Sequence, residues 1–344
     1  MRQIKLSIPF LAGAVAGVFG PLPAESTASA ETFRPIVLQV NAGDPNDLAR
    51  TRLERAADGT EVRRLRKTDE EFTNEQSVVK FFGKQTATEV AAEQGKADLL
   101  LGNNVLAHVP DLMDFVAGMK ILLKPGGIIT MEFPHLLQLM DQNQFDTIYH
   151  EHFSYFSFTT VEKVFAHHGI TLFDVEELKT HGGSLRIFGR HAEDASKPVG
   201  PRVTELKARE DKLGFNKLDI YLAFNEKVKE TKRAVLEFLG QAKRQGKKVV
   251  QYGAAGKANT LLNYCGIRND YMEYAVDKNP YKQNNYLPGS RLAVYPPEHI
   301  KETKPDYLFI GVWNLKEEIV AQTSYIREWG GKWIVPIPSV HVVD

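Results

Sequence analysis

Short apolar segments alternate with helix-length segments in the middle of the chain, and this alternation constrains the fold more than any other feature. The apolar segments 77–82, 97–105 and 128–133 are separated by helical patterns at 86–94 and 111–123. Strands that are apolar throughout and alternate with helices are typical of a parallel sheet covered on both faces. The sequence therefore predicts a doubly wound α/β lobe in this part of the chain.

A second α/β lobe is predicted near the C-terminus. Strands are expected at 248–252, 271–277, 306–312 and 332–336, and a glycine turn after the first of them leads into a helix. Between the lobes, apolar residues recur at helical spacing over 204–247 with charges on the opposite face, which predicts one long helix or a broken pair. The predicted fold class is α/β, with two doubly wound, Rossmann-like lobes joined by a long helical segment.

The first 75 residues are atypical. Residues 1–30 combine a basic start, an apolar run and the small-residue motif ASA, which is the pattern of a signal peptide for export. The alternative is an aberrant start, created by fusion or by a frameshift. In segment 31–75, residues 35–40 predict one strand, and the charged run 50–71 predicts a solvated helix or a disordered linker.

The charge balance argues against two classes of partner. Lysine plus arginine equals aspartate plus glutamate, 43 each, and the formal net charge is zero. Nothing in this balance favours a nucleic-acid partner or a polybasic membrane surface. The single cysteine, Cys265, excludes internal disulfides and a cysteine-rich zinc site, and it fits an intracellular location.

Acid–base side chains concentrate at residues 149–152. Tyr149, Glu151 and His152, with His150 between them, supply a phenol, a carboxylate and imidazoles, which are groups that move protons in enzymes. Two other interpretations stay open. The segment can be aromatic core, or Glu151 can join one of the two histidines in a metal site.

Polar residues at strand ends predict where the first lobe binds ligands. Ligands of doubly wound sheets bind at the carboxyl ends of the strands. Asn103, Asn104 and His108 follow one apolar strand, and Glu132 lies near the end of the next. We therefore expect these four side chains on one rim of the sheet.

Two glycine turns predict anion sites. The turn in 180–186 would bring backbone N–H groups and Arg186 to an anion. The turn in 253–257 opens a helix, Lys257 adds a positive charge, and Asp277 follows at a spacing typical of a ribose contact. The alternative at both places is a plain turn whose glycines permit close packing.

Five strings of residues occur in order from about residue 76 to the C-terminus, over more than three quarters of the chain. They are GNNVLAHVPD at 102–111, MEFPH at 131–135, QFDTIYHEHFSYFS at 144–157, THGGSLR at 180–186 and YGAAGK at 252–257. Together these strings resemble the sugar C-methyltransferases, which are S-adenosylmethionine-dependent enzymes of deoxysugar biosynthesis.

The resemblance implies a reaction. Members of this family methylate a ring carbon, typically C3, beside the ketone of a nucleotide-linked 4-keto-6-deoxy sugar. Such chemistry needs a base for the proton next to the carbonyl, donors that stabilise the enolate, and a methyl group in line with the carbanion. The resemblance implies that His108, Tyr149, Glu151 and His152 are catalytic, with His152 or His108 as the base. Tyr149 and Glu151 would orient the sugar and polarise its ketone.

The resemblance also implies two binding regions. Asn103 and Asn104 would contribute to the S-adenosylmethionine site. The nucleotide-linked sugar would be held by residues of the two glycine turns and the C-terminal lobe, namely His181, Gly183, Ser184, Arg186, Gly253, Lys257, Asn259 and Asp277.

The chain departs from the family near its N-terminus. Family members begin with a cysteine-based zinc module, and because no cysteine precedes Cys265, zinc is not expected here. The first strand and the glycine loop that hold the methionine part of the cofactor have no convincing match before residue 76. The predicted domains are 1–30, signal-peptide-like or aberrant; 31–75, atypical or disordered; 76–200, a partial class I methyltransferase domain with a catalytic insert; 201–247, a helical connector; and 248–344, a Rossmann-like nucleotide-sugar-binding domain.

The predicted function is S-adenosylmethionine-dependent C-methylation of a nucleotide-linked 4-keto-6-deoxy sugar, impaired if the cofactor loop is lost. The alternatives are a non-catalytic nucleotide-sugar-binding relic and, from the C-terminal lobe alone, a nicotinamide-dependent dehydrogenase. The expected partner is a nucleotide-diphosphate deoxysugar, with no nucleic acid and no membrane beyond the signal-like segment. We expect a monomer or small homo-oligomer in the cytoplasm, where both substrates occur, or an exported protein if the signal-like segment is genuine.

Overall fold

The computed structural model describes residues 3–7, 36–39, 52–55, 61–64 and 76–344. The chain forms two compact units. The first unit comprises residues 1–135, 151–178 and 184–210, and the second comprises 136–150, 179–183 and 211–344.

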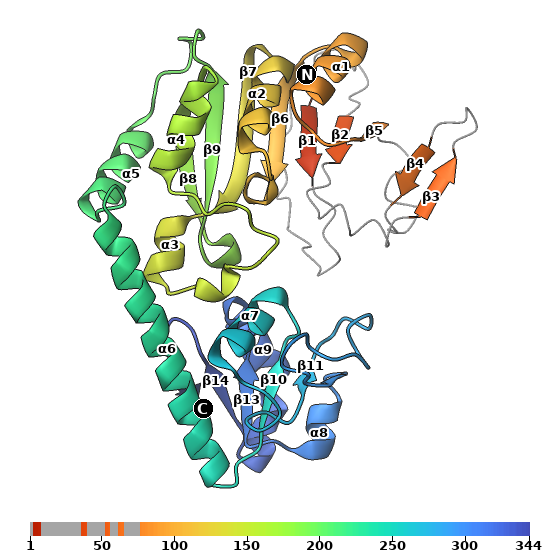
Figure 1. Ribbon diagram of the computed structural model, residues 1–344, viewed down its shortest axis with the longest axis vertical. Coiled ribbons are helices and arrows are strands. Elements are labelled where there is room, and N and C mark those ends of the chain that lie inside the picture. Colours follow the sequence, from red (N-terminus) through yellow and green to blue (C-terminus); the bar gives the residue numbers. More distant parts are fainter. Residues whose placement is uncertain (1–2, 8–35, 40–51, 56–60, 65–75) are drawn as a thin grey trace, which may run out of the picture. The chain divides into compact units, whose positions relative to one another are not determined.

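Seven strands of the described chain form the sheet of the first unit, in the order β5, β2, β1, β6, β7, β9 and β8 (Figure 1). Their bounds are Gln76–Val79, Ile36–Gln39, Gln3–Ser7, Ala97–Asn103, Leu123–Pro134, Ser184–His191 and Ile170–Leu178 in that order. Neighbouring strands from β5 to β7 are parallel, whereas β9 is antiparallel to both β7 and β8. The predicted α/β lobe is confirmed, with an antiparallel pair at one edge that the sequence pattern did not predict.

Strand β1 lies in the middle of this sheet. No strand was predicted at its residues, 3–7. It pairs with β2 on one side and with β6 on the other. The chain runs from β1 outward through β2 and β5 and then returns to β6, so the direction in which strands are added reverses between β1 and β6. The predicted strand at 35–40 corresponds to β2. The sheet thus includes strands before residue 76, while the domain boundaries and the signal-peptide interpretation of 1–30 stay predictions.

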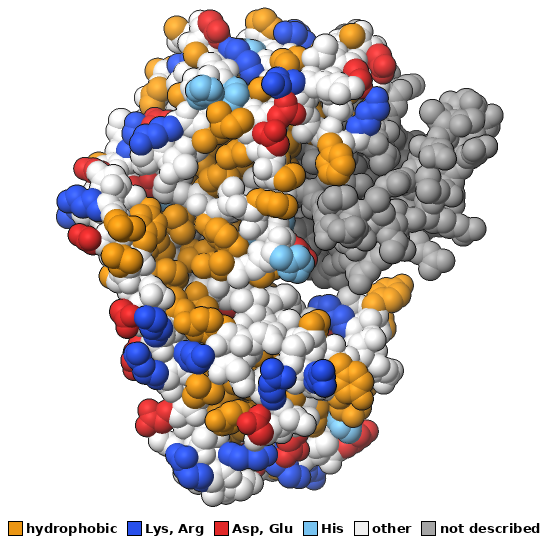
Figure 2. All heavy atoms as spheres, in the orientation of Figure 1, with side chains coloured by type: hydrophobic (Ala, Val, Ile, Leu, Met, Phe, Trp, Pro, Cys, Tyr) orange, Lys and Arg blue, Asp and Glu red, His pale blue; other side chains and the backbone are white. Residues whose placement is uncertain are grey.

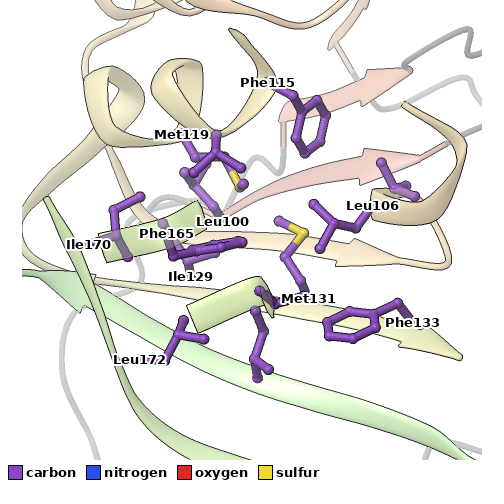
Figure 3. Close-up of a cluster of buried hydrophobic side chains, with 14 of the residues drawn as sticks. Leu100, Leu106, Phe115, Met119, Ile129, Met131, Phe133, Phe165, Ile170 and Leu172 are labelled. Atoms are coloured by element: carbon purple, nitrogen blue, oxygen red, sulfur yellow. The ribbon is translucent and has the colours of Figure 1, made fainter. Parts of the chain in front are cut away.

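The core of the first unit lies between this sheet and the helices α1 (Lys84–Gln94), α2 (Leu112–Leu122) and α4 (Phe158–His167). In Figure 3 the side chains of α2 and α4 lie over those of β6 and β7, with Phe115, Met119, Phe165, Leu100, Ile129 and Met131 all completely buried. Side-chain caps fix the starts of both helices: Asp111 accepts the N–H of Asp114, and Ser157 accepts that of Thr160.

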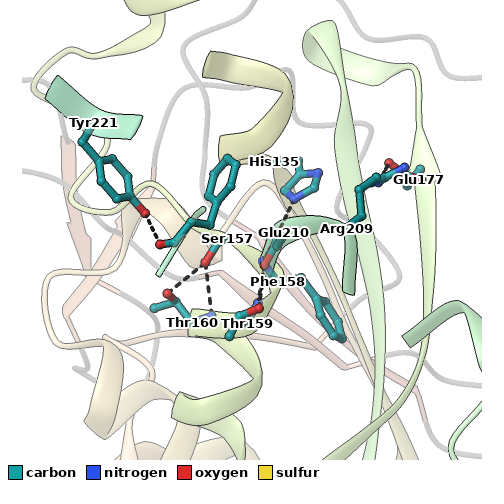
Figure 4. Close-up of polar contacts among 10 residues, drawn as sticks. His135, Ser157, Phe158, Thr159, Thr160, Glu177, Arg209, Glu210 and Tyr221 are labelled. Carbon is teal, nitrogen blue, oxygen red and sulfur yellow. Dashed lines mark hydrogen bonds and ion pairs between the residues drawn. The ribbon is translucent and has the colours of Figure 1, made fainter. Parts of the chain in front are cut away.

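A buried carboxylate ties α5 (Pro201–Lys212) to the start of α4. Glu210 accepts hydrogen bonds from the N–H groups of Phe158 at 2.7 Å and Thr159 at 2.9 Å, and it lies 2.8 Å from Nε2 of His135 (Figure 4). Burial opposes ionisation, but the hydrogen bonds from His135, Thr159 and Phe158 outweigh it and hold the pKa of Glu210 below its ordinary value. The negative charge also lies at the N-terminus of α4, where the helix dipole stabilises it.

A six-stranded sheet forms the centre of the second unit, in the order β12, β11, β10, β13, β14 and β15. The bounds are Val294–Tyr295, Ala275–Val276, Val249–Tyr252, Tyr307–Ile310, Lys332–Val335 and His341–Val343 in that order. All neighbours are parallel except β15, which is antiparallel to β14. The second predicted α/β lobe is therefore confirmed.

Helices from three parts of the chain belong to the second unit together with this sheet. They are α3 (Leu136–Asp141), η3 (Phe145–Thr147), η4 (Thr180–Gly182), α6 (Leu218–Arg244), α7 (Gly256–Cys265), α8 (His299–Thr303), η5 (Trp313–Leu315), α9 (Lys316–Gln322) and η6 (Ser324–Trp329). Leu239 of α6, Leu261 of α7 and Ile334 of β14 share one core with Phe145 of η3. Segment 136–150 is therefore part of the second unit, although it interrupts the chain of the first.

The structure decides between the two alternatives predicted for the connector and corrects one expectation for the charged run 50–71. The connector is a broken pair, α5 and α6, with Gly214 at a φ of +83° in the break, where glycine avoids the strain of a side chain. Within the charged run 50–71, helix is wrong for the described residues, because β3 (Arg52–Arg55) and β4 (Glu61–Arg64) form an antiparallel pair. Charge alone does not distinguish an antiparallel pair of short strands from a helix.

Basic and acidic side chains are mixed over the face of the molecule in Figure 2, as the balanced composition leads one to expect. Among the described residues, no helix combines the length and the apolar character needed to span a membrane.

Candidate functional site

Two histidines from separate segments meet in the first unit. His108 ends the short helix η2 (Leu106–His108), which follows β6, and it is 5% exposed. Its ring centroid lies 4.6 Å from that of His152, with the rings edge to face. The N–H of Phe153 donates to the carbonyl of Ala107 at 2.8 Å, which fixes His152 beside η2. The structure thus brings together the two residues predicted as candidates for the base.

The surroundings of His108 disfavour its protonated form. Burial lowers the pKa of His108 to about 4, the neighbouring His152 adds to this shift, and a hydrogen bond to the backbone of Glu151 opposes it. His108 is therefore a neutral imidazole near neutral pH. A neutral ring can orient a substrate or a second histidine, but a pKa this low makes it a weak base.

The other two predicted catalytic residues differ in their surroundings. Glu151 belongs to the first unit and is exposed. Tyr149 belongs to the second unit, where its ring lies next to the first residue of α7: a Cβ built on Gly256 would be 3.5 Å from Tyr149 Cε2. Tyr149 therefore lies beside the glycine turn that was predicted to bind an anion.

The turn from β10 to α7 is held by Asp277 at the end of β11. Asp277 accepts the N–H of Ala254 at 2.7 Å and that of Asn279 at 2.8 Å, and Lys282 Nζ is 3.3 Å away. Gly253 has a φ of +98°, and a Cβ there would lie 2.8 Å from Val312, so only glycine fits. The Asp277 carboxylate thus shapes the turn through contacts within the protein.

Lys257 and Asn259 lie in the first turn of α7. Lys257 Nζ donates to Asn314 at 2.7 Å and lies 4.9 Å from the centroid of the Trp313 ring. The side-chain oxygen of Asn259 is buried and has no hydrogen-bond partner among the described residues. A positive charge and a helix N-terminus together can bind a phosphate, which is the chemistry predicted for this turn.

The structure divides the predicted motif 180–186 between the two units. His181 and Gly183 belong to the second unit, and both have a positive φ, +54° and +120°. Ser184 and Arg186 belong to β9 of the first unit; Ser184 is buried, and Arg186 is paired with Glu132 at 3.1 Å and Glu176 at 3.5 Å. Arg186 is thus engaged by carboxylates of its own sheet.

Asn103 and Asn104 lie where the strand order reverses. Asn103 is the last residue of β6, the neighbour of β1, and Asn104 has a φ of +54° with its N–H donating to the carbonyl of Glu132 at 2.8 Å. Crevices at such reversals are the usual ligand sites of open parallel sheets. No group of three or more metal-ligating side chains occurs in the part of the chain that the structure describes.

Sequence reasoning missed Asp146 and Trp313, two residues of the second unit. Asp146 is fully buried and accepts the indole N–H of Trp313 at 2.7 Å. Asp146 lies within the string QFDTIYHEHFSYFS that was singled out, but nothing in that string indicates that its carboxylate is buried. Nothing in the sequence connects it with Trp313.

Comparisons with known proteins cover most of the chain. Residues 29–175 match the methyltransferase domain family, and residues 179–338 match the C-methyltransferase C-terminal domain family. The curated C-methyltransferase NovU of Streptomyces niveus is 36% identical over 263 residues, which is 76% of this chain and 62% of NovU. The chain thus spans less than two thirds of that relative's length.

Solved structures show weaker similarity. A methyltransferase of Anabaena variabilis described as dependent on S-adenosylmethionine is 14% identical over 46% of this chain and 68% of its own, with a TM-score of 0.32. The N-methyltransferase NodS of Bradyrhizobium japonicum is 12% identical over 56% of this chain and 86% of its own, with a TM-score of 0.29.

Proposed function

We propose, from the premise that the chain belongs to the S-adenosylmethionine-dependent C-methyltransferase family, that it methylates a carbon beside the ketone of a nucleotide-linked 4-keto-6-deoxy sugar. The pairing of His108 with His152 is the observation that carries this proposal. An enzyme that removes a carbon-bound proton needs a base held in place and kept from gaining a second proton.

The first sheet fits the cofactor of this family. Strands β1 and β6 are parallel neighbours at the reversal of strand order, and Asn103 and Asn104 follow β6 there. S-adenosylmethionine supplies an electrophilic methyl group. In this proposal the two asparagines bind S-adenosylmethionine. The loop after β1 lies outside the described residues.

We assign the base to His152. The low pKa of His108 makes it a weak base, and its ring lies edge-on to His152, whose positive charge would lower that pKa further. The proton of the carbon beside the ketone passes to a ring nitrogen of His152, and the bonding electrons move into the enolate. Tyr149 and Glu151 are proposed to orient the sugar and polarise its ketone, as in the family that the sequence resembles.

The nucleotide part of the substrate is assigned to the turn between β10 and α7. Gly253 allows the tight turn, Lys257 supplies a positive charge, and Asn259 has an unpaired buried oxygen close by in the same helix. Asp277 would act through the shape of the turn. His181, Gly183, Ser184 and Arg186 stay proposed substrate contacts, with Arg186 exchanging a carboxylate partner for the substrate.

Deuterium exchange separates proton removal from methyl transfer. A thymidine-diphosphate 4-keto-6-deoxy sugar incubated with the protein in D₂O, without S-adenosylmethionine, should gain deuterium at the carbon beside the ketone. We expect His152→Gln to lose this exchange while keeping the native circular dichroism spectrum. The exposed His150→Gln is the matched control and should exchange normally. Wild-type methyl transfer by His152→Gln would contradict the assignment.

The two alternative functions are not favoured by the comparisons, which point to methyltransferases. S-adenosylmethionine titration tests the first of them, because a binding relic would take up the nucleotide sugar alone. Binding of a nicotinamide cofactor would support the second alternative, the dehydrogenase.

A further inference from the structure

Asp146 is a buried carboxylate in the second unit that the proposed reaction does not use. Its side chain is inaccessible to solvent, Oδ2 accepts the Trp313 indole N–H at 2.7 Å, and Oδ1 has no hydrogen-bond partner among the described residues. Burying a charge without full hydrogen bonding is costly. An amide would accept the same indole hydrogen bond at a lower cost, so a purely structural role does not account for the charge.

Trp313 is held in one orientation by residues from two inserted segments. Asp146 lies in segment 136–150, and Gly182 in segment 179–183 packs directly on the indole: a Cβ on Gly182 would be 2.8 Å from Trp313 Cη2. Gln144 donates to the carbonyl of Gly182 at 2.6 Å, which fixes that glycine. The indole therefore has little freedom to rotate.

Lys257 lies on the face of this fixed indole. Its Nζ is 4.9 Å from the ring centroid, a distance at which the ring attracts a cation. One N–H of the ammonium donates a hydrogen bond to Asn314 at 2.7 Å. The contact with the ring face requires no hydrogen bond. The remaining N–H groups can bind an anion while the indole holds the ammonium in place.

We propose that Asp146 is a positioning residue for Lys257, which it serves by fixing the indole of Trp313 and by placing a negative charge near the ammonium. The inference rests on the proposed function, in which Lys257 binds the diphosphate of the substrate. It adds to the proposed diphosphate site a residue that makes no contact with the substrate.

The electrostatics of the cluster agree with this arrangement. Burial lowers the pKa of Lys257, and the charge of Asp146 opposes that shift. Burial raises the pKa of Asp146 to about 6, while Lys257, the Trp313 hydrogen bond and the backbone N–H groups of Asp146 and Thr147 oppose it, so Asp146 is mostly ionised at pH 7. Lys257 from α7 is the charged group that faces Asp146, and without the carboxylate it should lose its proton at lower pH.

Binding of thymidine diphosphate at pH 6.5 to 9.5, followed by isothermal titration calorimetry, tests the role of Asp146. In the wild type we expect affinity to fall at alkaline pH as Lys257 deprotonates. In Asp146→Asn this fall should begin at lower pH, and the dissociation constant at pH 8.5 should rise about tenfold, the loss of one strong charged contact. The thermal midpoint of Asp146→Asn should not fall, because the amide still accepts from Trp313 and no buried charge remains.

Tryptophan variants separate the hydrogen bond from the loss of an indole. Trp313→Phe should weaken binding at every pH, because it removes the donor to Asp146. Trp329→Phe is the matched control, since Trp329 donates to the carbonyl of Pro305 at 2.9 Å in the same unit, and it should bind like the wild type.

Three outcomes would overturn the inference. If the wild-type chain binds no thymidine diphosphate at any pH, the proposal of a nucleotide-linked substrate is refuted. The inference about Asp146 is then refuted with it. If the wild type binds and Asp146→Asn matches it across the pH range, only the role of Asp146 is refuted. If Asp146→Asn loses thermal stability and its affinity falls equally at all pH values, the carboxylate is structural.

Discussion

At the scale of single residues, His108 makes the stability of the first unit depend on pH. Its pKa is lowered from 6.5 to about 4 in the folded protein. Between these values the unfolded chain binds more protons than the folded one, so the free energy of unfolding rises with pH. The contribution of the neutral, buried His108 to the free energy of unfolding is complete above pH 6.5 and is lost as the pH falls toward 4.

His108→Gln should remove this dependence. From the shift of His108, lowering the pH from 7 to 5 should cost the wild type about 2 kcal/mol of unfolding free energy that the variant does not lose. Urea denaturation at the two pH values measures the difference, with His150→Gln as the exposed control. An equal pH dependence in His108→Gln and the wild type would show that His108 is accessible to protons in the native state.

Single residues also show what sequence can and cannot predict about the site. His108 and His152 were both predicted at the reacting centre, because both belong to strings typical of one family. Asp146 and Trp313 are 167 positions apart, and their hydrogen bond exists only because an inserted segment packs on the second unit. Arg186 was predicted to bind substrate, but Glu132 and Glu176 come near it only through sheet register.

At the scale of elements, the contact between α5 and α4 depends on Glu210. This carboxylate accepts from two N–H groups at the start of α4, and its side chain is 1% exposed. We expect Glu210→Gln to lower the free energy of unfolding by about 2–4 kcal/mol, because the amide cannot accept all the hydrogen bonds and His135 loses its charged partner. Chemical denaturation at pH 7 measures the loss.

The exposed Glu205 of the same helix provides the control. Glu205→Gln should change stability by no more than about 0.5 kcal/mol, as surface substitutions usually do. Equal stability of the two variants would mean that Glu210 contributes nothing beyond a surface charge.

Element positions followed from hydrophobic pattern wherever segments were long and apolar. The strands β6 and β7 and the helices α1 and α2 lie close to their predicted places because their apolar faces build the core. Strand β1 was missed because five residues that include a lysine, placed before an apolar run, fit a signal peptide equally well. The strand predicted at 271–277 is regular only over Ala275–Val276, since Met272 and Tyr274 pack in the core outside the ladder.

At the scale of the whole molecule, separate cores predict separate responses to ligands. One buried cluster belongs to the first sheet, and two others lie around the second sheet. S-adenosylhomocysteine should stabilise the first unit and thymidine diphosphate the second, each by about 2.7 kcal/mol at one hundred times its dissociation constant. Calorimetric scans should therefore show two transitions that shift one at a time; a single transition moved equally by both ligands would contradict the prediction.

The path of the chain between the units has a consequence for protein synthesis. Segments 136–150 and 179–183 belong to the second unit, yet the first strand of that unit's sheet, β10, begins only at Val249. On the ribosome Phe145 and Asp146 are made well before the sheet and the tryptophan that will enclose them. A nascent chain must carry these side chains without their partners until residue 313 has been made, so the native burial of Phe145 and Asp146 follows their synthesis with a long delay.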